Sequence, residues 1–207
     1  MPALAYNDAL DAYSLRKKIR KTRRQLRPDQ QNKAAYHLSK TLGSSPLFLR
    51  SQHIAFYLPN DGEIDPSLLM ARAWQHNKTC YLPVLAPLSE KLLFVRHDAG
   101  DALMLNQFNI PEPIFRQQNT RQPWALDLVI TPLVAFDSSG NRLGMGGGYY
   151  DRTFAFLHST KTRKKPKLIG IAHSFQQTAH LPCQCWDVPL DGVFTDKNRF
   201  MFETSRN

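Results

Sequence analysis

The stretch that decides the fold reads Asp127-Leu128-Val129-Ile130-Thr131-Pro132-Leu133-Val134-Ala135-Phe136-Asp137, followed by Ser138-Ser139-Gly140-Asn141-Arg142-Leu143-Gly144-Met145-Gly146-Gly147-Gly148-Tyr149-Tyr150-Asp151-Arg152. Its first part is an apolar run rich in β-branched residues, which is typical of a strand buried on both faces. Its second part places four glycines within five positions. Glycine has no Cβ, so successive backbone N–H groups can turn inward and form a concave anion site. A helix beginning near Tyr150 would add the partial positive charge of its N-terminus. The stretch therefore predicts a strand, a phosphate-binding loop and a helix, in that order.

The spacing of these glycines excludes the two commonest phosphate-binding loops. A Walker A loop ends in Gly-Lys-Ser/Thr, and no lysine follows the glycines here. The dinucleotide-binding fingerprint needs glycine at its first, third and sixth positions, but the sixth position counted from Gly144 is Tyr149. The loop is of another kind, with Arg142 before it and Asp151-Arg152 after it.

Length and composition indicate one globular domain over residues 1–207. Hydrophobic residues make up 42% of the chain, and no apolar run approaches the roughly 18 residues of a membrane span. The N-terminus lacks the basic and apolar regions of a secretory signal, and residues 1–10 are a candidate for disorder. The cysteines, Cys80, Cys183 and Cys185, form no CxxC-type zinc pattern. We therefore expect reduced thiols and a cytoplasmic location.

The net charge of +10 is concentrated in two segments. Eight positive residues and no acid lie within 16–27, and five positive residues lie within 161–167. Together they exceed the net charge, so the rest of the chain is mildly acidic. For most of these side chains, a solvated surface is the usual interpretation.

Hydrophobic periodicity predicts alternating helices and strands. Helices are expected over about 7–26, 29–42, 65–74 and 150–158, the third with Asp65 as N-cap and Pro66 as first residue. Besides the run quoted above, strands are expected over 53–58, 79–84, 168–173 and within 186–195, with shorter, antiparallel pieces over 92–95 and 101–105. This order favours a single α/β domain built on a largely parallel sheet.

The segment Arg142–Arg152, together with the strand that precedes it, resembles the signature of the 5-formyltetrahydrofolate cyclo-ligases, also called methenyltetrahydrofolate synthetases. A lone Gly-x-Gly is usually only a turn, but a match over eleven residues with its flanking strand is specific. The resemblance extends from Arg16 to Asp191. It implies a Rossmann-like open, mostly parallel sheet flanked by helices, related to sugar-phosphate isomerases and CoA transferases.

The resemblance further implies an ATP site around the glycines. In the family, a basic residue and an arginine four positions later reach the nucleotide phosphates, and Arg16 and Arg20 match that pair on one side of a helix. The family usually has lysine first, so Lys17 in a slipped register stays an alternative. Arg142 and Tyr150 are candidates for ATP binding and, in addition, for a catalytic role. The other ATP-binding candidates are Leu143, Gly144, Met145, Gly146, Gly147, Gly148 and Tyr149.

The folate site is implied at the end of the strand 53–58, where α/β sheets collect ligands. Leu58 and Glu63 stand at substrate-contacting positions, and a carboxylate can pair with the adjacent N–H groups of a pterin. A solvated loop acid is the alternative for Glu63. Phe108, where the family often has tryptophan, would stack on the ligand's rings. The remaining substrate-binding candidates are Met145, Gly146, Gly147, Gly148 and Tyr149.

Asp151 and Asp191 are the residues that the resemblance assigns to Mg²⁺. This ion takes hard oxygen ligands and commonly uses one or two carboxylates, with phosphates and waters completing its shell. Asp187 and Asp191 flank a Val-Pro pair four positions apart. Taken alone, each of these acids would more often be a cap or a surface acid.

The implied reaction is that of a carbon–nitrogen ligase of one-carbon metabolism. ATP phosphorylates the formyl oxygen of 5-formyltetrahydrofolate to an imidate phosphate, N10 attacks the activated carbon, and 5,10-methenyltetrahydrofolate, ADP and phosphate result. Phosphoryl transfer mainly needs positioning and charge stabilisation, so no covalent protein nucleophile is assigned. The expected partner is a small folate, polyglutamylated, whose tail residues 161–167 could attract. We expect a monomer that binds neither nucleic acid nor membrane.

Two other classes compete with this interpretation. A nucleic-acid-binding module would explain the basic segment 16–27 but not the glycines or the aspartates. A sugar-phosphate isomerase or CoA-transferase relative would share the fold, act without ATP and need a catalytic acid that the sequence does not reveal.

Overall fold

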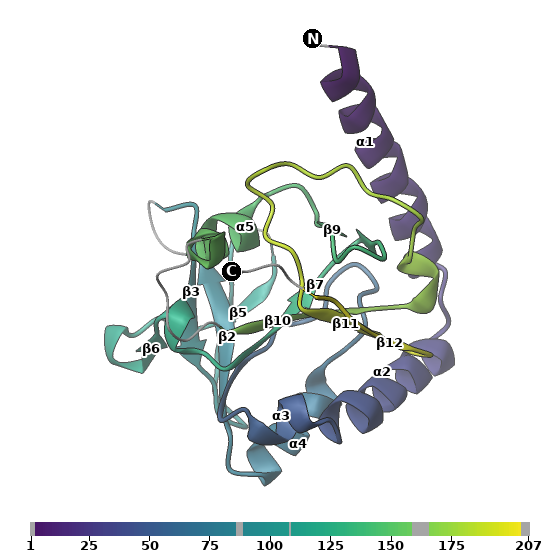
Figure 1. Ribbon diagram of the computed structural model, residues 1–207. Helices are drawn as coiled ribbons and strands as arrows, with labels where there is room; N and C mark the ends of the chain where they lie inside the picture. Colours follow the sequence, from purple (N-terminus) through teal and green to yellow (C-terminus); the bar gives the residue numbers. More distant parts are fainter. Residues whose placement is uncertain (1–2, 86–88, 108, 159–165, 204–207) are drawn as a thin grey trace.

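A central sheet organises the molecule. The computed structural model describes residues 3–85, 89–107, 109–158 and 166–203, and of residues 3–10 only the backbone. Within these ranges, eight strands pair in the order β12-β11-β10-β7-β1-β2-β3-β6 (Figure 1). The strands are β1 (His53–Ala55), β2 (Thr79–Leu85), β3 (Leu92–Arg96), β6 (Thr120–Arg121), β7 (Leu128–Pro132), β10 (Lys167–Ala172), β11 (Gly192–Thr195) and β12 (Arg199–Met201). From β11 to β2 all neighbours are parallel, and the antiparallel pairs lie toward the edges. The predicted open, mostly parallel sheet is confirmed.

Alternation along the strands divides the core into two layers. In β7, Leu128 and Ile130 pack on one side of the sheet with the helices α2 (Pro28–Gly43) and α4 (Ser67–Gln75). Val129 points to the other side, because successive side chains of a strand face opposite ways. The run is buried on both faces, as its composition predicts. Figure 1 shows α2, α4 and the short α3 (Pro46–Arg50) together on one side.

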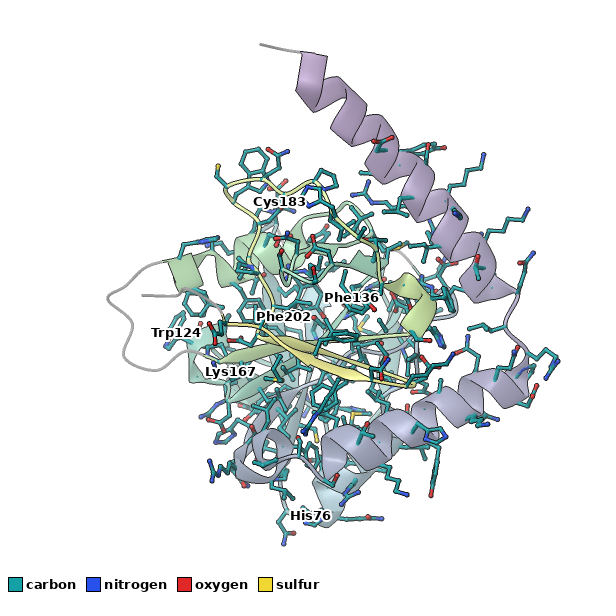
Figure 2. All side chains as sticks on the ribbon, turned by 45° about the vertical axis from the view of Figure 1, so that its right-hand side comes forward. His76, Trp124, Phe136, Lys167, Cys183 and Phe202 are labelled. Carbon is teal, nitrogen blue, oxygen red and sulfur yellow. The ribbon has the colours of Figure 1, made fainter. Side chains whose placement is uncertain are left out.

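The second layer consists of α5 (Tyr149–Phe154) and a small hairpin. The hairpin pairs β8 (Ala135–Phe136) with β9 (Arg142–Leu143). Phe136 is fully buried and lies inside the molecule in Figure 2. Phe154 and Leu157 are buried in the same cluster. A further pair, β4 (Leu103–Leu105) with β5 (Pro111–Pro113), forms its own two-stranded sheet.

Helix α1 (Ala3–Arg24) attaches to the domain through its second half. Ala12 and Ile19 are buried against Val134, Leu143 and Leu181, and the beginning of the helix projects away from the body (Figure 1). The helix includes most of the segment 1–10 that the sequence marked as a candidate for disorder. Since Ile19 lies on its inner face, the basic residues within 16–24 are distributed around a helix with one packed side.

Some boundaries differ from the sequence-based expectation. Strand β1 has only three residues, although the Phe56 N–H still donates to Tyr81 O of β2 at 2.8 Å. Helix α4 begins at Ser67 with Pro66 as its N-cap residue, one position later than predicted. Asp65 still acts at this end, since its carboxylate accepts the Ser67 N–H at 2.8 Å. The β8–β9 hairpin, which the sequence analysis did not foresee, separates β7 from the glycines.

None of the helices in the described part of the chain is both long and apolar enough to cross a membrane.

Candidate functional site

A cavity of about 760 Å³ opens at the carboxyl edge of the sheet. Its floor is made by residues within β2 and at or just beyond the ends of β1 and β7, namely Tyr57, Leu58, Leu82, Pro83, Pro132 and Leu133. The chain proceeds outward in opposite directions from β1 and β7, so the cavity lies where the strand order reverses. This is the place where open α/β sheets bind ligands, and the volume lies within the range of small-molecule pockets.

One wall of the cavity is the glycine loop, Gly144–Gly148, all of which lines it. Gly146 and Gly148 have φ angles of +102° and +63°, in the left-handed region that side chains disfavour. Gly148 is also the N-cap residue of α5. The loop is held from behind by Arg152, which donates to Gly147 O and stacks over the Tyr149 ring. The four glycines therefore form a wall of exposed backbone, as the sequence predicts for a phosphate-binding loop.

Arg142 stands beside this loop with its side chain only 5% exposed. Its Nη2 donates to Asp151 at 2.6 Å, and its Nη1 donates to Val188 O at 2.9 Å. The guanidinium also lies over the Tyr150 ring, 5.9 Å from its centre. These contacts fix Arg142 at the cavity wall in one orientation, which suits a preorganised cation at a site of developing negative charge.

Helix α1 contributes Arg16 to the same wall. Its Nε donates to Gly144 O at 2.8 Å, and the side chain lines the cavity. Lys17 is exposed and is not among the described residues that line the cavity. Arg20 is not among them either, because its Nε pairs with Asp61 at 2.6 Å. Of the predicted phosphate-binding side chains of α1, the structure thus brings Arg16 to the glycine loop and turns Arg20 toward the opposite wall.

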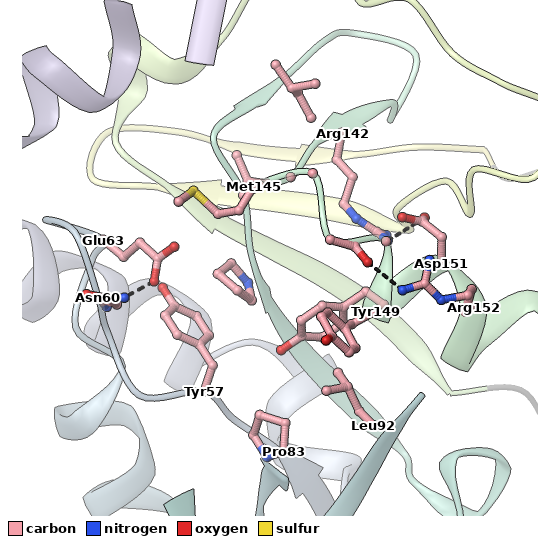
Figure 3. Close-up of a pocket in the computed structure, with 18 of the residues that line it drawn as sticks. Tyr57, Asn60, Glu63, Pro83, Leu92, Arg142, Met145, Tyr149, Asp151 and Arg152 are labelled. Carbon is pink, nitrogen blue, oxygen red and sulfur yellow. Dashed lines mark hydrogen bonds and ion pairs between the residues drawn. The ribbon is translucent and has the colours of Figure 1, made fainter. Parts of the chain in front are cut away.

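The opposite wall is the acid loop, Asn60–Glu63. Glu63 lines the cavity, is largely buried and accepts the Asn60 N–H at 3.1 Å. Burial raises the pKa of Glu63 to about 7, against the opposing effect of the Arg23 charge. Figure 3 shows Glu63 with Asn60 and Tyr57 on one side of the cavity, and Arg142 with Asp151 and Arg152 on the other. A carboxylate at the cavity wall that titrates near neutrality can accept hydrogen bonds or exchange a proton with a ligand.

Aromatic side chains lie between the two walls. Tyr149 and Tyr150 begin α5 and line the cavity, and the Tyr150 ring stacks on Phe154. Burial, with the nearby Glu63 charge, raises the pKa of Tyr150 well above its usual value. Tyr57 donates to Ile64 O at 2.7 Å and so supports the acid loop. Tyr150 therefore stays a neutral phenol at physiological pH, able to donate a hydrogen bond.

The predicted pair of magnesium ligands is not brought together. Asp151 lines the cavity, where its Oδ1 meets Arg142 and the Val188 N–H. Asp191 is 2% exposed, precedes β11 and therefore lies at the amino edge of the parallel strands. There it accepts the Leu168 N–H at 2.8 Å and pairs with Lys167 at 3.0 Å. The structure therefore does not bring Asp191 to the cavity, because its carboxylate has partners at the opposite edge of the sheet.

The donor set that remains fits a magnesium ion bound mainly through phosphates. In the described ranges, no three or more His, Cys, Asp or Glu side chains are grouped as a metal site. Asp151 offers one carboxylate at the cavity, and Asp187, the other acid beside the Val-Pro pair, also lines it. One or two carboxylates with phosphate and water oxygens are the usual surroundings of Mg²⁺.

Several cavity residues were not found from the sequence. Asp61 and Arg152 line the cavity, as do Asn106, which follows β4, and Glu112, which lies in β5. Arg152 lies within the recognised signature, so its inclusion could have been predicted, whereas the others carry no local signal. Leu58, Leu143, Met145 and Tyr149 line the cavity as the resemblance implied. Phe108 and residues 161–165 of the second basic segment lie outside the described residues.

Comparison with known proteins gives a consistent result. The sequence model of the 5-formyltetrahydrofolate cyclo-ligase family matches residues 10–196. A 5-formyltetrahydrofolate cyclo-ligase of Escherichia coli (strain K12) is 39% identical over 178 residues, covering 86% of this chain and 96% of the relative. The protein of that name from Haemophilus influenzae is 41% identical over 177 residues, covering 85% and 92%. Among solved structures, the 5,10-methenyltetrahydrofolate synthetase of Aquifex aeolicus superposes with a TM-score of 0.78 at 31% identity, covering 95% of each chain.

Proposed function

The chain belongs to the 5-formyltetrahydrofolate cyclo-ligase family, and on that premise we propose that it couples ring closure of 5-formyltetrahydrofolate to the cleavage of ATP. As a member of this family it is a ligase enzyme that forms methenyltetrahydrofolate. The use of ATP, the role of Mg²⁺ and the course of the reaction are the parts proposed here. The isomerase and transferase alternative is set aside by the family membership.

The observation that carries the proposal is the meeting of two chemically different walls in one cavity. The glycine loop, with Arg16 and Arg142, offers backbone N–H groups and positive charge. Glu63 and Leu58 offer a carboxylate and an apolar surface across the same cavity. A reaction that transfers a phosphoryl group from a polyanion to a flat heterocycle needs both ligands side by side, because alignment supplies much of the rate.

The proposed reaction has two steps. The formyl oxygen of 5-formyltetrahydrofolate attacks the γ-phosphorus of ATP, the bond to the bridging oxygen breaks, and ADP leaves. N10 then attacks the activated formyl carbon, phosphate leaves with the former formyl oxygen, and the N10 proton is lost to give the methenyl cation. The chemistry needs no nucleophile from the protein, so what it asks of the chain is alignment and charge.

Each wall has a defined part in this proposal. Arg16, Arg142 and the glycine loop bind the phosphates of ATP and stabilise charge on the transferring group. Glu63 accepts hydrogen bonds from the pterin edge, and Leu58 packs against the pterin. Tyr149 and Tyr150 lie where the two substrates meet, and Tyr150 can donate to a phosphate oxygen. Asp151 would hold Mg²⁺, which when bound offsets the charge of the phosphates.

The nucleic-acid alternative is disfavoured because the arginines of α1, unlike its exposed lysines, are held by partners within the protein. Arg20, Arg23 and Arg24 donate to Asp61, and Arg16 donates to Gly144 O. A nonspecific nucleic-acid surface instead presents its cations to solvent, free to meet phosphates. A monomeric state, a cytoplasmic location and a polyglutamylated substrate remain proposals.

The test is to mix the purified protein with 5-formyltetrahydrofolate and MgATP and follow methenyltetrahydrofolate by its near-ultraviolet absorbance. We expect a rise in absorbance that requires ATP and is abolished by EDTA. A flat trace from folded protein that still binds ATP would contradict the proposed substrate. A rise without ATP would contradict the proposed phosphoryl transfer.

A further inference from the structure

The acid loop contains a turn with two consecutive positive φ angles. Asp61 and Gly62 follow one another with φ angles of +53° and +76°. Aspartate and glycine are among the residues that adopt this region most readily, so the pair suits the turn, and contacts with the rest of the protein decide how the turn is oriented. Gly62 is closely packed, since a Cβ at this position would lie 2.9 Å from Arg23 O. Its own carbonyl is met by Gln31 Nε2 at 3.0 Å and lies 3.3 Å from His173 Nε2.

The contacts that orient the turn come chiefly from α1. Arg20, Arg23 and Arg24 are spaced three and four residues apart, so they project from one side of the helix. All of them donate to the Asp61 carboxylate, Arg20 at 2.6 Å and Arg23 at 2.9 Å. Two of these arginines are partly exposed, whereas the Arg23 side chain is completely buried. Arg23 is therefore the member of this group whose geometry the interior fixes.

Arg23 connects the acid loop to the floor of the cavity. Besides Asp61 Oδ2, it donates from Nε to Asp61 O at 2.7 Å and from Nη1 to Leu133 O at 3.3 Å. The same Nη1 lies 3.7 Å from Glu63 Oε1. Arg23 is not among the described residues that line the cavity, but Asp61, Glu63 and Leu133 are. A guanidinium suits this position because its planar fork can serve several acceptors at once.

We propose that Arg23 is a positioning residue for folate binding, which holds the acid loop against the end of β7 so that Glu63 faces the cavity. Helix α1 thereby serves both substrates, through Arg16 at the glycine loop and through Arg23 at the acid loop. The inference rests on the proposed function, in which Glu63 binds the pterin.

The charge of Arg23 has a second effect on Glu63. The charged and titratable groups around Glu63 are Arg23 and Arg20 from α1, Asp61 from the loop itself, Tyr57 beyond β1 and Tyr150 from α5. Among them, the Arg23 charge is the main influence that lowers the pKa of Glu63, against its burial. Removing that charge raises the pKa of Glu63, so the carboxylate form that accepts the pterin N–H groups is reached only at higher pH.

The experiment compares Arg23→Gln and Arg23→Lys with the wild type. For Arg23→Gln we expect KM for 5-formyltetrahydrofolate to rise at least about tenfold, the effect of losing a hydrogen bond to a charged group. KM for ATP should stay within about twofold, because Arg16 keeps its own contact with Gly144. Folate KM should rise as the pH falls and Glu63 takes up its proton. The pH below which this rise begins should be higher in Arg23→Gln than in the wild type, and it should change much less in Arg23→Lys, which keeps the charge. If Arg23 had only a structural role, its replacement would leave the pH profile of folate KM unchanged and would not raise one KM without the other.

Arg27→Gln is the matched control. Arg27 follows α1, and its side chain pairs with Asp29 at the exposed surface. We expect it to leave both KM values and the pH profile unchanged. If Arg23→Gln leaves folate KM at the wild-type value, or raises both KM values equally, the proposal is overturned. If Arg23→Gln does not fold, Asp61→Asn decides from the other side of the same contact: a selective rise in folate KM supports the proposal, and an unchanged KM overturns it.

The proposed function and this inference fail in different ways. A wild-type protein that neither converts nor binds 5-formyltetrahydrofolate contradicts the function. A wild-type protein that turns over normally, with Arg23 variants of unaltered folate KM, contradicts only the role of Arg23.

Discussion

The two walls of the cavity are built on different principles. The glycine loop is a continuous segment whose working parts are its own backbone, and its neighbours Arg142 and Asp151 lie within a few positions of it. The acid loop is held by residues that are distant in the sequence. Arg23, which contacts it directly, lies 38 positions before Asp61 and also contacts Leu133 at the end of β7. A phosphate site can be written in one stretch of sequence, because backbone N–H groups bind any phosphate. The acid loop instead depends on tertiary contacts.

This contrast assigns different kinetic effects to the two walls. Groups that stabilise charge in the transferring phosphoryl group should act mainly on kcat and on ATP. Groups that bind the pterin equally before and during the reaction should act mainly on KM for folate. Substitutions on the two walls can therefore be told apart by which kinetic constant they change.

The largest expected effect belongs to Asp151, at the end of the glycine-loop segment. Asp151→Asn keeps the shape and the acceptor for the Val188 N–H but removes the charge opposite Arg142. We expect kcat to fall by about 100-fold or more, the order of effect seen when an electrostatic group of an active site is lost. Saturation with Mg²⁺ should require more of the ion. The measurement is turnover as a function of Mg²⁺ concentration.

Asp191→Asn is the comparison for this change, since both acids were assigned to the metal from the sequence. Asp191 pairs with Lys167 at the amino edge of the sheet. We expect the free energy of unfolding to fall by about 1–3 kcal/mol, because a buried charged acceptor is lost. Both kcat and the Mg²⁺ requirement should stay unchanged. A loss of Mg²⁺ dependence in Asp191→Asn alone would restore the original assignment.

The backbone of the glycine loop can be tested with two alanines. Gly148→Ala and Gly100→Ala both place a side chain at positive φ, +63° and +91°, so each should lower stability by about 1–2 kcal/mol. Only Gly148 lies in the cavity, and its new Cβ would meet Arg152 Nη1 at 2.6 Å. We expect kcat/KM for ATP to fall roughly tenfold in Gly148→Ala, as for one lost hydrogen bond to a charged group. Gly100→Ala should retain activity, and equal losses in both variants would mean that strain alone matters.

Glu63→Gln tests the acid loop through both binding and stability. The pKa of Glu63 is about 7 in the folded protein, raised by burial from 4.5. The unfolded chain therefore gives up this proton more readily, and the wild type loses stability as pH rises from about 4.5 through 7. Replacing Glu63 with glutamine removes this pH-dependent loss of stability. From pH 5 to pH 8 the variant should gain stability relative to the wild type, by on the order of 3 kcal/mol at most.

Although Glu63→Gln should be more stable than the wild type, it should bind folate more weakly. Glu63→Gln should raise KM for 5-formyltetrahydrofolate by about tenfold at pH 8 and leave kcat nearly unchanged. Urea unfolding at both pH values and steady-state kinetics make the two measurements. Glu203→Gln, at an exposed position, is the control. A variant that is less stable than the wild type at pH 8 would contradict the burial of a titrating carboxyl at Glu63.

The features that could be predicted from the sequence also differ between the glycine loop and the acid loop. The run Leu128–Ile130 identified the central strand because apolar residues buried on both faces leave a clear pattern. The glycine loop and Arg142 were found because they are neighbours in the chain. Arg23 was read as part of a solvated basic surface, and nothing local distinguishes its burial from the exposure of Arg24. The position of Asp191 could not be predicted, because its sequence neighbourhood does not reveal which edge of the sheet it occupies.

The smallest expected effect is that of Lys17→Ala on KM for ATP. It tests which residue of α1 faces the glycine loop. Successive residues of a helix are turned by about 100°, so Arg16 and Lys17 cannot both reach Gly144. The structure directs Arg16 to the loop and leaves Lys17 exposed. Lys17→Ala should therefore change KM for ATP by less than about twofold, as exposed charges usually do. Arg16→Ala should raise that KM by about tenfold through the loss of a charged contact. If Lys17→Ala has the larger effect on ATP, the helix binds the nucleotide in the slipped register, and α1 must rotate when ATP enters the cavity.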